Sequence, residues 1–160
     1  MEQKLNEFDL PIGVHQIKYQ IPGNFKYSKI CNIVPGKLFR SKYFQITNLI
    51  AAGTTNGPII IYTDQFKSLS HVCLLCSHSS SISDIIQLKN NCNFLSISTD
   101  GTISKWSNDD CSLVSSYQNI AIPGETKFAL HPPNSNFIWV YTIGFHAFLF
   151  DLQKGVIVKK

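Results

Sequence analysis

The segment from Asn93 to Trp106 constrains the fold more than any other, because it reads as two short strands that fold back at Asp100-Gly101. Asp-Gly between alternating β-forming residues is a strong hairpin signal, since glycine adopts positive φ at little cost. A two-residue loop would set Ser98 against Ile103, and a three-residue loop would set Ile97 against Ile103. We expect the three-residue loop, because it puts the aliphatic residues on one face and the serines with Trp106 on the other. A hydroxyl on that second face could then accept the indole N–H.

The hairpin belongs to a repeat with a constant offset of 44 residues. Two series of residues share this offset: Tyr62, Trp106 and Phe150, and Ile50, Phe94 and Ile138. Asn56-Gly57 also repeats the turn chemistry of Asp100-Gly101. A period in the low forties with strand-rich units is typical of propeller blades. Helical repeats of similar period are disfavoured, because the units are rich in Ile, Thr, Ser, Phe and Asn and are broken by Gly and Pro.

The sequence therefore predicts an all-β fold, a partial β-propeller of about three four-stranded blades. Residues 1–10 are expected to be disordered, and residues 11–160 to form the propeller segment, with blades at about 29–76, 78–117 and 124–160. The strands are expected at 12–21, 29–34, 47–53, 59–62, 71–76, 81–88, 94–98, 102–106, 112–117, 126–130, 137–142, 146–151 and 156–159. Propellers usually close with four to eight blades. We therefore expect a fragment or N-terminal part of a larger propeller, or an arc completed by a partner or by further copies of itself. A truncated gene product that is poorly stable alone is the other reading.

The run from His78 to Trp106 resembles a WD repeat (WD40 family), with Trp106 in the place of the family's terminal Trp. In that family a His, a strand hydroxyl, the turn Asp and the Trp form a structural hydrogen-bonded network. The resemblance implies that these are His78, Ser98 (or Ser96), Asp100 and Trp106. It also implies a non-enzymatic protein-interaction scaffold.

This sequence departs from the family pattern on both sides of the motif. Ser77 stands where the family usually has Gly, and Ser107 follows Trp106 where the family has Asp. The order of the blades from about Asn48 onward also resembles the start of rabconnectin-3 beta type WD-repeat proteins. That resemblance implies a link to vacuolar proton-pump assembly or vesicle trafficking, as a cytoplasmic protein peripheral to endomembranes.

Composition limits the other classes of function. The net charge is +4, but the lysines are scattered, whereas a nucleic-acid binder usually concentrates its charge in one stripe. The five cysteines are odd in number and irregularly spaced, which argues against a disulfide framework and for a reducing compartment. The N-terminal residues are polar, unlike a signal peptide, and no apolar run is long enough to span a bilayer. We expect protein partners of unknown identity, with no nucleic acid.

The competing hypothesis is a small thiol or zinc-site protein that uses Cys73, Cys76 and His78. Zinc needs four ligands in tetrahedral geometry, and no second Cys or His pair completes the set. On a strand Cys73 and Cys76 would also point to opposite faces. We therefore favour structural cysteines and expect no metal, no cofactor and no catalytic residue.

A basic and aromatic group precedes the first regular blade. It consists of Arg40, Lys42, Tyr43 and Phe44. Such side chains in a loop are enriched at binding surfaces, which makes them candidates for contacting a partner. The alternative reading is that Tyr43 and Phe44 belong to the core and that the charges are solvated.

Overall fold

The structure is a computed structural model, which describes residues 26–37, 39–40, 46, 48–63, 70–89, 93–118, 120, 126–130, 136–142 and 146–159. These residues form three antiparallel four-stranded sheets, which we call blades 1, 2 and 3. Blade 1 contains β1 (Tyr27–Ile33), β2 (Leu49–Thr54), β3 (Ile59–Thr63) and β4 (Ser70–Leu75). Blade 2 contains β5 (Ile82–Gln87), β6 (Asn93–Ser98), β7 (Ile103–Ser107) and β8 (Leu113–Tyr117). Blade 3 contains β9 (Thr126–Leu130), β10 (Phe137–Thr142), β11 (Ala147–Asp151) and β12 (Val156–Lys159).

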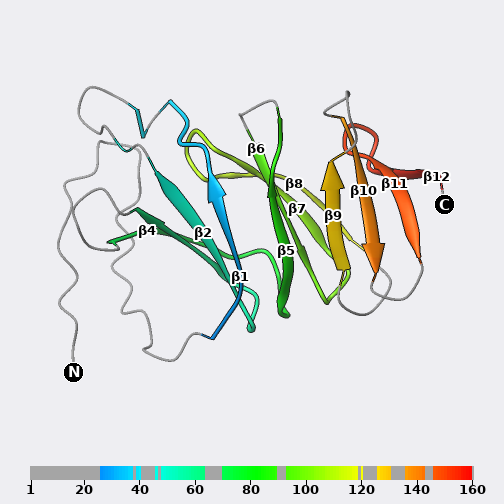
Figure 1. The fold of residues 1–160 in the computed structure, drawn as a ribbon, viewed down its shortest axis with the longest axis horizontal. Helices are drawn as coiled ribbons and strands as arrows, with labels where there is room; N and C mark the ends of the chain where they lie inside the picture. The colour runs from blue at the N-terminus through cyan, green and yellow to red at the C-terminus, as the bar shows by residue number, and fades with distance from the viewer. Residues whose placement is uncertain are drawn as a thin grey trace.

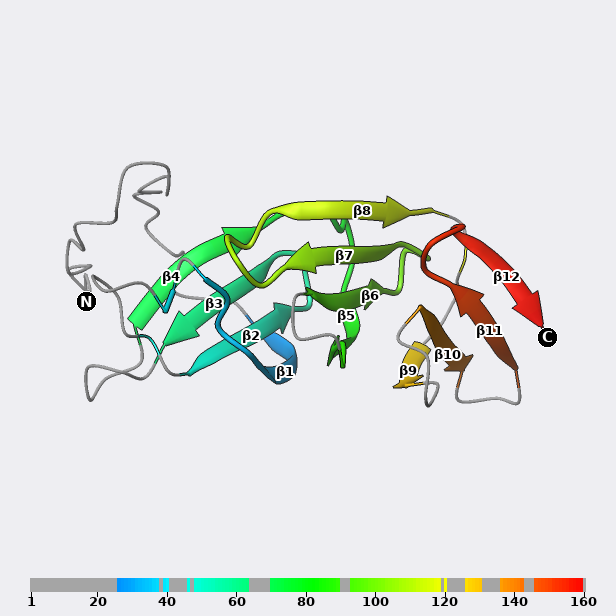
Figure 2. The same cartoon turned by 90° about the horizontal axis from the view of Figure 1, so that it is seen from above.

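Within each blade the four strands pair in sequence order, so every blade is a simple up-and-down meander. The blades follow one another along the molecule from the N-terminal to the C-terminal side (Figure 1). Seen from above, they form an open arc with β1, β5 and β9 along one side and β4, β8 and β12 along the other (Figure 2). The predicted fold class, a partial propeller of three four-stranded blades, is confirmed.

The 44-residue offset has a direct structural meaning. Ile50 pairs with Tyr62 in blade 1, Phe94 with Trp106 in blade 2, and Ile138 with Phe150 in blade 3. The two series seen in the sequence are therefore cross-strand neighbours at one equivalent position of the two middle strands. Cross-strand pairs are the unit of sheet stabilisation, so this position recurs with large apolar residues.

The register expected for the central hairpin is also confirmed. Ile97 pairs with Ile103, and the Ser98 amide donates to the Thr102 carbonyl oxygen at 3.1 Å. Gly101 has φ +82° and Gly57, at the equivalent turn of blade 1, has φ +114°, which explains why both turns carry glycine.

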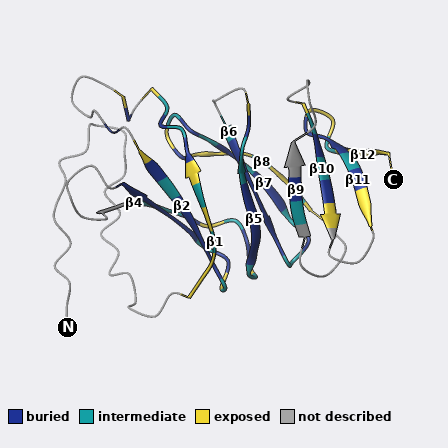
Figure 3. Ribbon diagram, in the orientation of Figure 1, coloured by how far each residue is buried: buried dark blue, intermediate teal, exposed yellow. Residues whose placement is uncertain are grey.

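Two apolar cores lie between the blades, one on each face of blade 2 (Figure 3). Successive side chains of a strand point to opposite faces, so β6 sends Phe94 toward blade 1, and Leu95 and Ile97 toward blade 3. The first core joins Leu49, Ala51, Ile59 and Ile61 of blade 1 to Ile82, Ile85, Phe94 and Trp106 of blade 2. The second joins Leu95, Ile97 and Ile103 to Phe128, Ile138, Val140, Phe148 and Phe150 of blade 3. Middle strands buried on both faces read as apolar runs, such as the isoleucines of β3.

Most observed strands differ from the expected ranges by one or two residues at an end, which is the usual uncertainty of strand boundaries. β1 begins at Tyr27 and so extends the expected strand at 29–34 toward the N-terminus. The strand expected at 12–21 and the disorder expected at 1–10 lie outside the described residues.

Candidate functional site

The centre of blade 2 holds a buried chain of hydrogen bonds between three side chains. The indole Nε1 of Trp106, on β7, donates to Ser96 Oγ at 2.8 Å, and His78 Nε2 lies 2.7 Å from the same oxygen. Ser96 is fully buried on β6, and His78 lies in the segment between β4 and β5. These hydrogen bonds therefore fix the segment between β4 and β5, which connects blades 1 and 2, to the middle of the blade 2 sheet. Trp106 also stacks on Phe94, with ring centroids 6.4 Å apart.

The structure corrects the choice of serine. Ser96, the alternative given by the resemblance, occupies the hydroxyl position, and the choice of Ser98 is wrong. Trp106 pairs with Phe94, so Ser96 is two residues, roughly 7 Å, along β6 and Ser98 is roughly 13 Å along it. The indole N–H can span only the shorter distance. Ser98 instead donates its hydroxyl to the Ser80 carbonyl oxygen at 2.9 Å and accepts the Asp100 amide at 3.2 Å.

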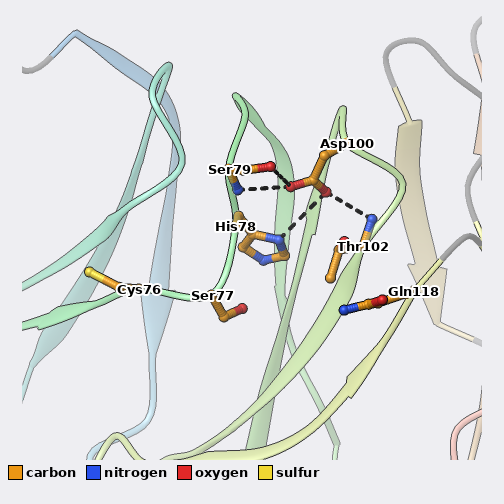
Figure 4. Close-up of a pocket in the computed structure, with 7 residues that line it drawn as sticks. All are labelled: Cys76, Ser77, His78, Ser79, Asp100, Thr102 and Gln118. Atoms are coloured by element: carbon orange, nitrogen blue, oxygen red, sulfur yellow. Dashed lines mark hydrogen bonds and ion pairs between the residues drawn. The ribbon is translucent and has the colours of Figure 1, made fainter.

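Asp100 ties the hairpin turn to the same connection (Figure 4). Its Oδ2 accepts the Ser79 amide at 2.8 Å and the Ser79 hydroxyl at 3.0 Å, and its Oδ1 accepts the Thr102 amide at 2.9 Å. Desolvation raises the pKa of Asp100, but these hydrogen bonds together outweigh it and hold the pKa below its usual value. The turn carboxylate is thus ionised and acts as a multiple acceptor.

His78 is the buried titratable group of this network. Its Nδ1 lies 4.0 Å from Asp100 Oδ1, too far for a hydrogen bond. Burial lowers the pKa of His78 to about 4, and the Asp100 charge only partly offsets that effect. The imidazole is therefore neutral at pH 7.

The order Ser96, His78, Asp100 resembles a nucleophile, base and acid, but its geometry is structural. Ser96 is 0% exposed and its oxygen already contacts both the indole and the imidazole. A substrate carbonyl has no access to that oxygen, which a nucleophilic serine requires. An open hollow of about 500 Å³ adjoins the network, lined by Cys76, Ser77, His78, Ser79, Asp100, Thr102 and Gln118. In Figure 4 the Cys76 side chain lies well away from the His78 ring.

The geometry does not support the zinc hypothesis. Cys73 packs against the core between blades 1 and 2, Cys76 is exposed beyond the end of β4, and His78 is occupied by Ser96. Within the described ranges, no group of three or more His, Cys, Asp or Glu residues could hold a metal ion.

The candidate partner-contacting group is described only in part. Arg40 is exposed, and its amide donates to the Gly36 carbonyl oxygen at 3.1 Å, while its neighbour Phe39 is buried in the core. Lys42, Tyr43 and Phe44 lie outside the described residues.

The innermost strands carry a polar tie that the sequence did not reveal. Lys29 on β1 forms an ion pair with buried Asp84 on β5, with 2.9 Å between Nζ and Oδ1. Asp84 Oδ2 also accepts the Phe128 amide of β9 at 2.8 Å, so one carboxylate joins all three blades. The hydrogen bond to Asp84 raises the pKa of Lys29 more than burial lowers it.

The 44-residue offset relates the strand partners of these charged residues but not the charged residues themselves. Lys29, Asp84 and Lys127 are the first-strand partners of Gly53, Ile97 and Tyr141, which are themselves spaced by the repeat. First strands lack a constant spacing because the loops before the middle strands differ in length. Only the paired register shows that the three charged residues are equivalent.

The turn between β7 and β8 forms a second tie between blades. The side-chain Nδ2 of buried Asn108 donates to the Val34 carbonyl oxygen at 2.6 Å. The backbone carbonyl oxygen of Asn108 accepts the Gly36 amide at 3.0 Å. The Lys37 amide donates to Asp109 Oδ1 at 2.8 Å. A Cβ on Gly36 would lie 2.4 Å from that same oxygen, so the close approach requires glycine. Asp109 therefore helps to hold this turn against the segment that follows β1.

The solved structures that are similar to this chain include a β-propeller domain. The β-propeller domain of Cps50 (Swd1) from Myceliophteria thermophila has a TM-score of 0.57 and 18% identity, covering 70% of this chain and 34% of that one. A chain of the mitotic checkpoint complex has a TM-score of 0.55 and 16% identity, covering 69% of this chain and 34% of that one. This chain therefore has the fold of part of a β-propeller, as the resemblance to a WD repeat implies. It spans about a third of the length of these structures.

The sequence comparisons add no narrower assignment. No family model matches the chain, and no curated protein matches it. Within the part of the chain that the structure describes, no helix is long and apolar enough to cross a membrane.

Proposed function

We propose that this chain is a segment of a larger WD-type propeller and serves as a protein-interaction scaffold. Propellers act through surface patches and loops carried on a rigid stack of blades. The fold and the two sets of polar contacts between blades support this role, because they hold the loops at fixed positions. The buried position of Ser96 also favours a structural over a catalytic use of the blade 2 network.

One observation carries the proposal: a cross-strand pair that recurs with the repeat. Gly53 pairs with Ile59, Ile97 with Ile103, and Tyr141 with Ala147. The first two pairs are buried by the blade that follows them, and both Ile97 and Ile103 are 0% exposed.

The third pair is uncovered, since Tyr141 is 39% exposed and Ala147 is exposed. A further blade stacked in the same sense would cover that face of blade 3. The face is thus continuous with two interfaces of one kind, which favours another four-stranded blade as its occupant.

A photo-crosslinking phenylalanine at position 141 tests this in cells that produce the protein, with the same group at exposed Val114 on β8 as the matched control. We expect position 141, and not position 114, to crosslink to a residue in a strand of another WD-type repeat, identified by mass spectrometry of the linked peptide. A pattern shared by both positions, or a crosslink to a helical segment, would refute the proposal.

The source of that blade is tested by an immunoblot with an antibody against residues 93–117. A product far larger than 18.0 kDa would mean that the blade follows in the same polypeptide. A product near that mass would mean that a partner chain or a second copy supplies it.

A narrower role rests on the resemblance to rabconnectin-3 beta type proteins. On that basis we propose that the scaffold acts in vacuolar proton-pump assembly, on the cytoplasmic side of endomembranes. Its support is the order of the blades, and the solved propellers above do not bear on it. Co-purification of pump subunits with the endogenous protein is the expected result. Their absence from a purification that retains the other propeller blades would remove this narrower role and leave the scaffold proposal intact.

A further inference from the structure

The hollow beside the blade 2 network lies at one end of that blade. Three segments line it: the connection between β4 and β5, the turn between β6 and β7, and the residue that follows β8. They meet because neighbouring strands of the blade are antiparallel, so β6 and β8 end where β5 and β7 begin. The buried network does not account for this open space of about 500 Å³.

The lining of the hollow is polar and carries one charge. Apart from Cys76, each described residue that lines it has a hydroxyl, amide, imidazole or carboxylate group, and none of them is a lysine, an arginine or an aliphatic residue. His78 is neutral at pH 7, because burial lowers its pKa to about 4. The Asp100 carboxylate is therefore the one charge among these side chains.

That carboxylate is ionised and held in a fixed position. The Ser79 amide, the Ser79 hydroxyl and the Thr102 amide all donate to it, and these hydrogen bonds hold the pKa of Asp100 below its usual value. Its side chain is 17% exposed, so a cation can reach it from the open side. Partial burial also leaves the negative charge less screened by water than a charge on an open surface. The hollow is thus suited to a positively charged group.

The hydrogen bonds already made by Asp100 select the kind of cation. A carboxylate offers about four acceptor positions, and the bonds from Ser79 and Thr102 take three of them. A guanidinium pairs best through two parallel hydrogen bonds, one to each oxygen, for which too few positions are left. An ammonium is a compact charge with three separate donors, so one donor for Asp100 is enough.

Neutral acceptors for the other two donors line the same hollow. Thr102, just before β7, brings a hydroxyl, and Gln118, just after β8, brings a side-chain amide oxygen (Figure 4). Gln118 is exposed, so its amide can turn toward a ligand. One carboxylate with neutral oxygens beside it is the donor-accepting environment that a primary ammonium requires.

We propose that this hollow binds the side-chain ammonium of a lysine on a protein partner. The ammonium pairs with Asp100, and Thr102 and Gln118 accept its remaining hydrogen bonds. This inference rests on the scaffold role proposed above in one respect, namely that the lysine belongs to a partner protein. Recognition of the amine itself depends only on the hollow.

The test titrates the isotope-labelled full chain with acetylated and amidated Gly-Gly-Xaa-Gly-Gly peptides, in which the central residue is lysine, arginine or norleucine, and follows binding by NMR. We expect the lysine peptide to cause saturable shifts of the Thr102 backbone amide and the Gln118 side-chain amide. The norleucine peptide lacks the amine and should bind about tenfold more weakly. The arginine peptide should bind about threefold more weakly, because its fork finds too few acceptor positions.

Gln118→Lys is the main variant, since a lysine at this exposed position brings its own ammonium to the hollow. It should weaken binding of the lysine peptide about tenfold. Val114→Lys is the matched control, because it adds the same charge to the exposed part of β8, roughly 13 Å from position 118. Charges more than about 10 Å apart are largely screened, so this control should bind like the wild type. Asp100→Asn should also lose binding, and its melting temperature shows whether the turn is intact.

Several results would overturn the proposal. One is the absence of saturable shifts at Thr102 and Gln118 with the lysine peptide, and another is equal binding of the norleucine peptide. Equal or tighter binding of the arginine peptide would contradict the choice of lysine, and unchanged binding by Gln118→Lys would place the ligand elsewhere. None of these results bears on the crosslink at position 141, and failure of that crosslink would not alter peptide binding, so the two proposals fail separately.

Discussion

The neutral, buried His78 should make this chain sensitive to mild acid. The pKa of the imidazole is about 4 in the folded protein, and an unfolded histidine has a pKa near 6.5. Between these values the unfolded chain binds a proton that the folded chain does not, so the free energy of unfolding falls as the pH falls. At about 1.4 kcal/mol per pH unit, the interval corresponds to roughly 3 kcal/mol. This contribution is fully present above about pH 6.5 and is lost by about pH 4.

Urea unfolding followed by tryptophan fluorescence at about pH 7, 6 and 5 measures this effect. The matched variant is His78→Gln, whose amide can still reach Ser96 but cannot titrate. The other histidines and the carboxylates are shared by both proteins, so the difference between the two pH profiles isolates His78. We expect the wild type to lose about 2 kcal/mol more than the variant between pH 7 and 5. Parallel profiles would show that His78 is not held neutral by burial, and the description of the network would be wrong.

Substitutions at three further positions test the contacts within and between the blades. Trp106→Ala should cost about 3–5 kcal/mol by thermal or urea unfolding, because it empties a core position, whereas Trp106→Phe should cost only about 1 kcal/mol for the lost hydrogen bond; an unchanged melting temperature in Trp106→Ala would contradict the placement of the hairpin. Asp84→Asn should cost about 1–3 kcal/mol, because the ion pair with Lys29 loses its charge, and equal stability of the two proteins would argue against this tie. Gly57→Ala should cost more than about 1 kcal/mol, because φ is +114° and the new Cβ would lie 2.3 Å from the His78 carbonyl oxygen; a stable variant would mean that the turn can relax.

The blades could be predicted from the sequence because their signals are local. Each middle hairpin is a short contiguous segment. Its apolar pair recurs at a fixed offset, and the turn glycines of the first two hairpins share that offset. The pairs Phe94–Trp106 and Ile138–Phe150 lie on adjacent strands joined by a short loop, so their register follows from loop length. Constraints of this kind act between residues that are close together in the sequence, so the sequence alone reveals them.

The contacts between blades could not be predicted in the same way. The bond from Asn108 to Val34 and the ion pair of Asp84 with Lys29 join residues that are far apart in the chain and have no shared motif. The choice between Ser96 and Ser98 depended on where the indole N–H lies across the sheet, which is a tertiary feature.

Blade 2 is where the two kinds of constraint meet. Its two faces supply one side of each core between the blades, its carboxylate at Asp84 contacts β1 and β9, and its β7–β8 turn docks on the segment after β1. In a repeat protein, stability is close to the sum of the stabilities of the repeats and of their nearest-neighbour interfaces. A change at the centre of blade 2 therefore weakens both of the interfaces that the three described blades make with one another, whereas the same change in blade 3 weakens only the interface that it shares with blade 2. The buried hydrogen bonds of His78 and Trp106 with Ser96 also lie in blade 2, so this repeat, on which both neighbours depend for their packing, also has a polar network in its centre.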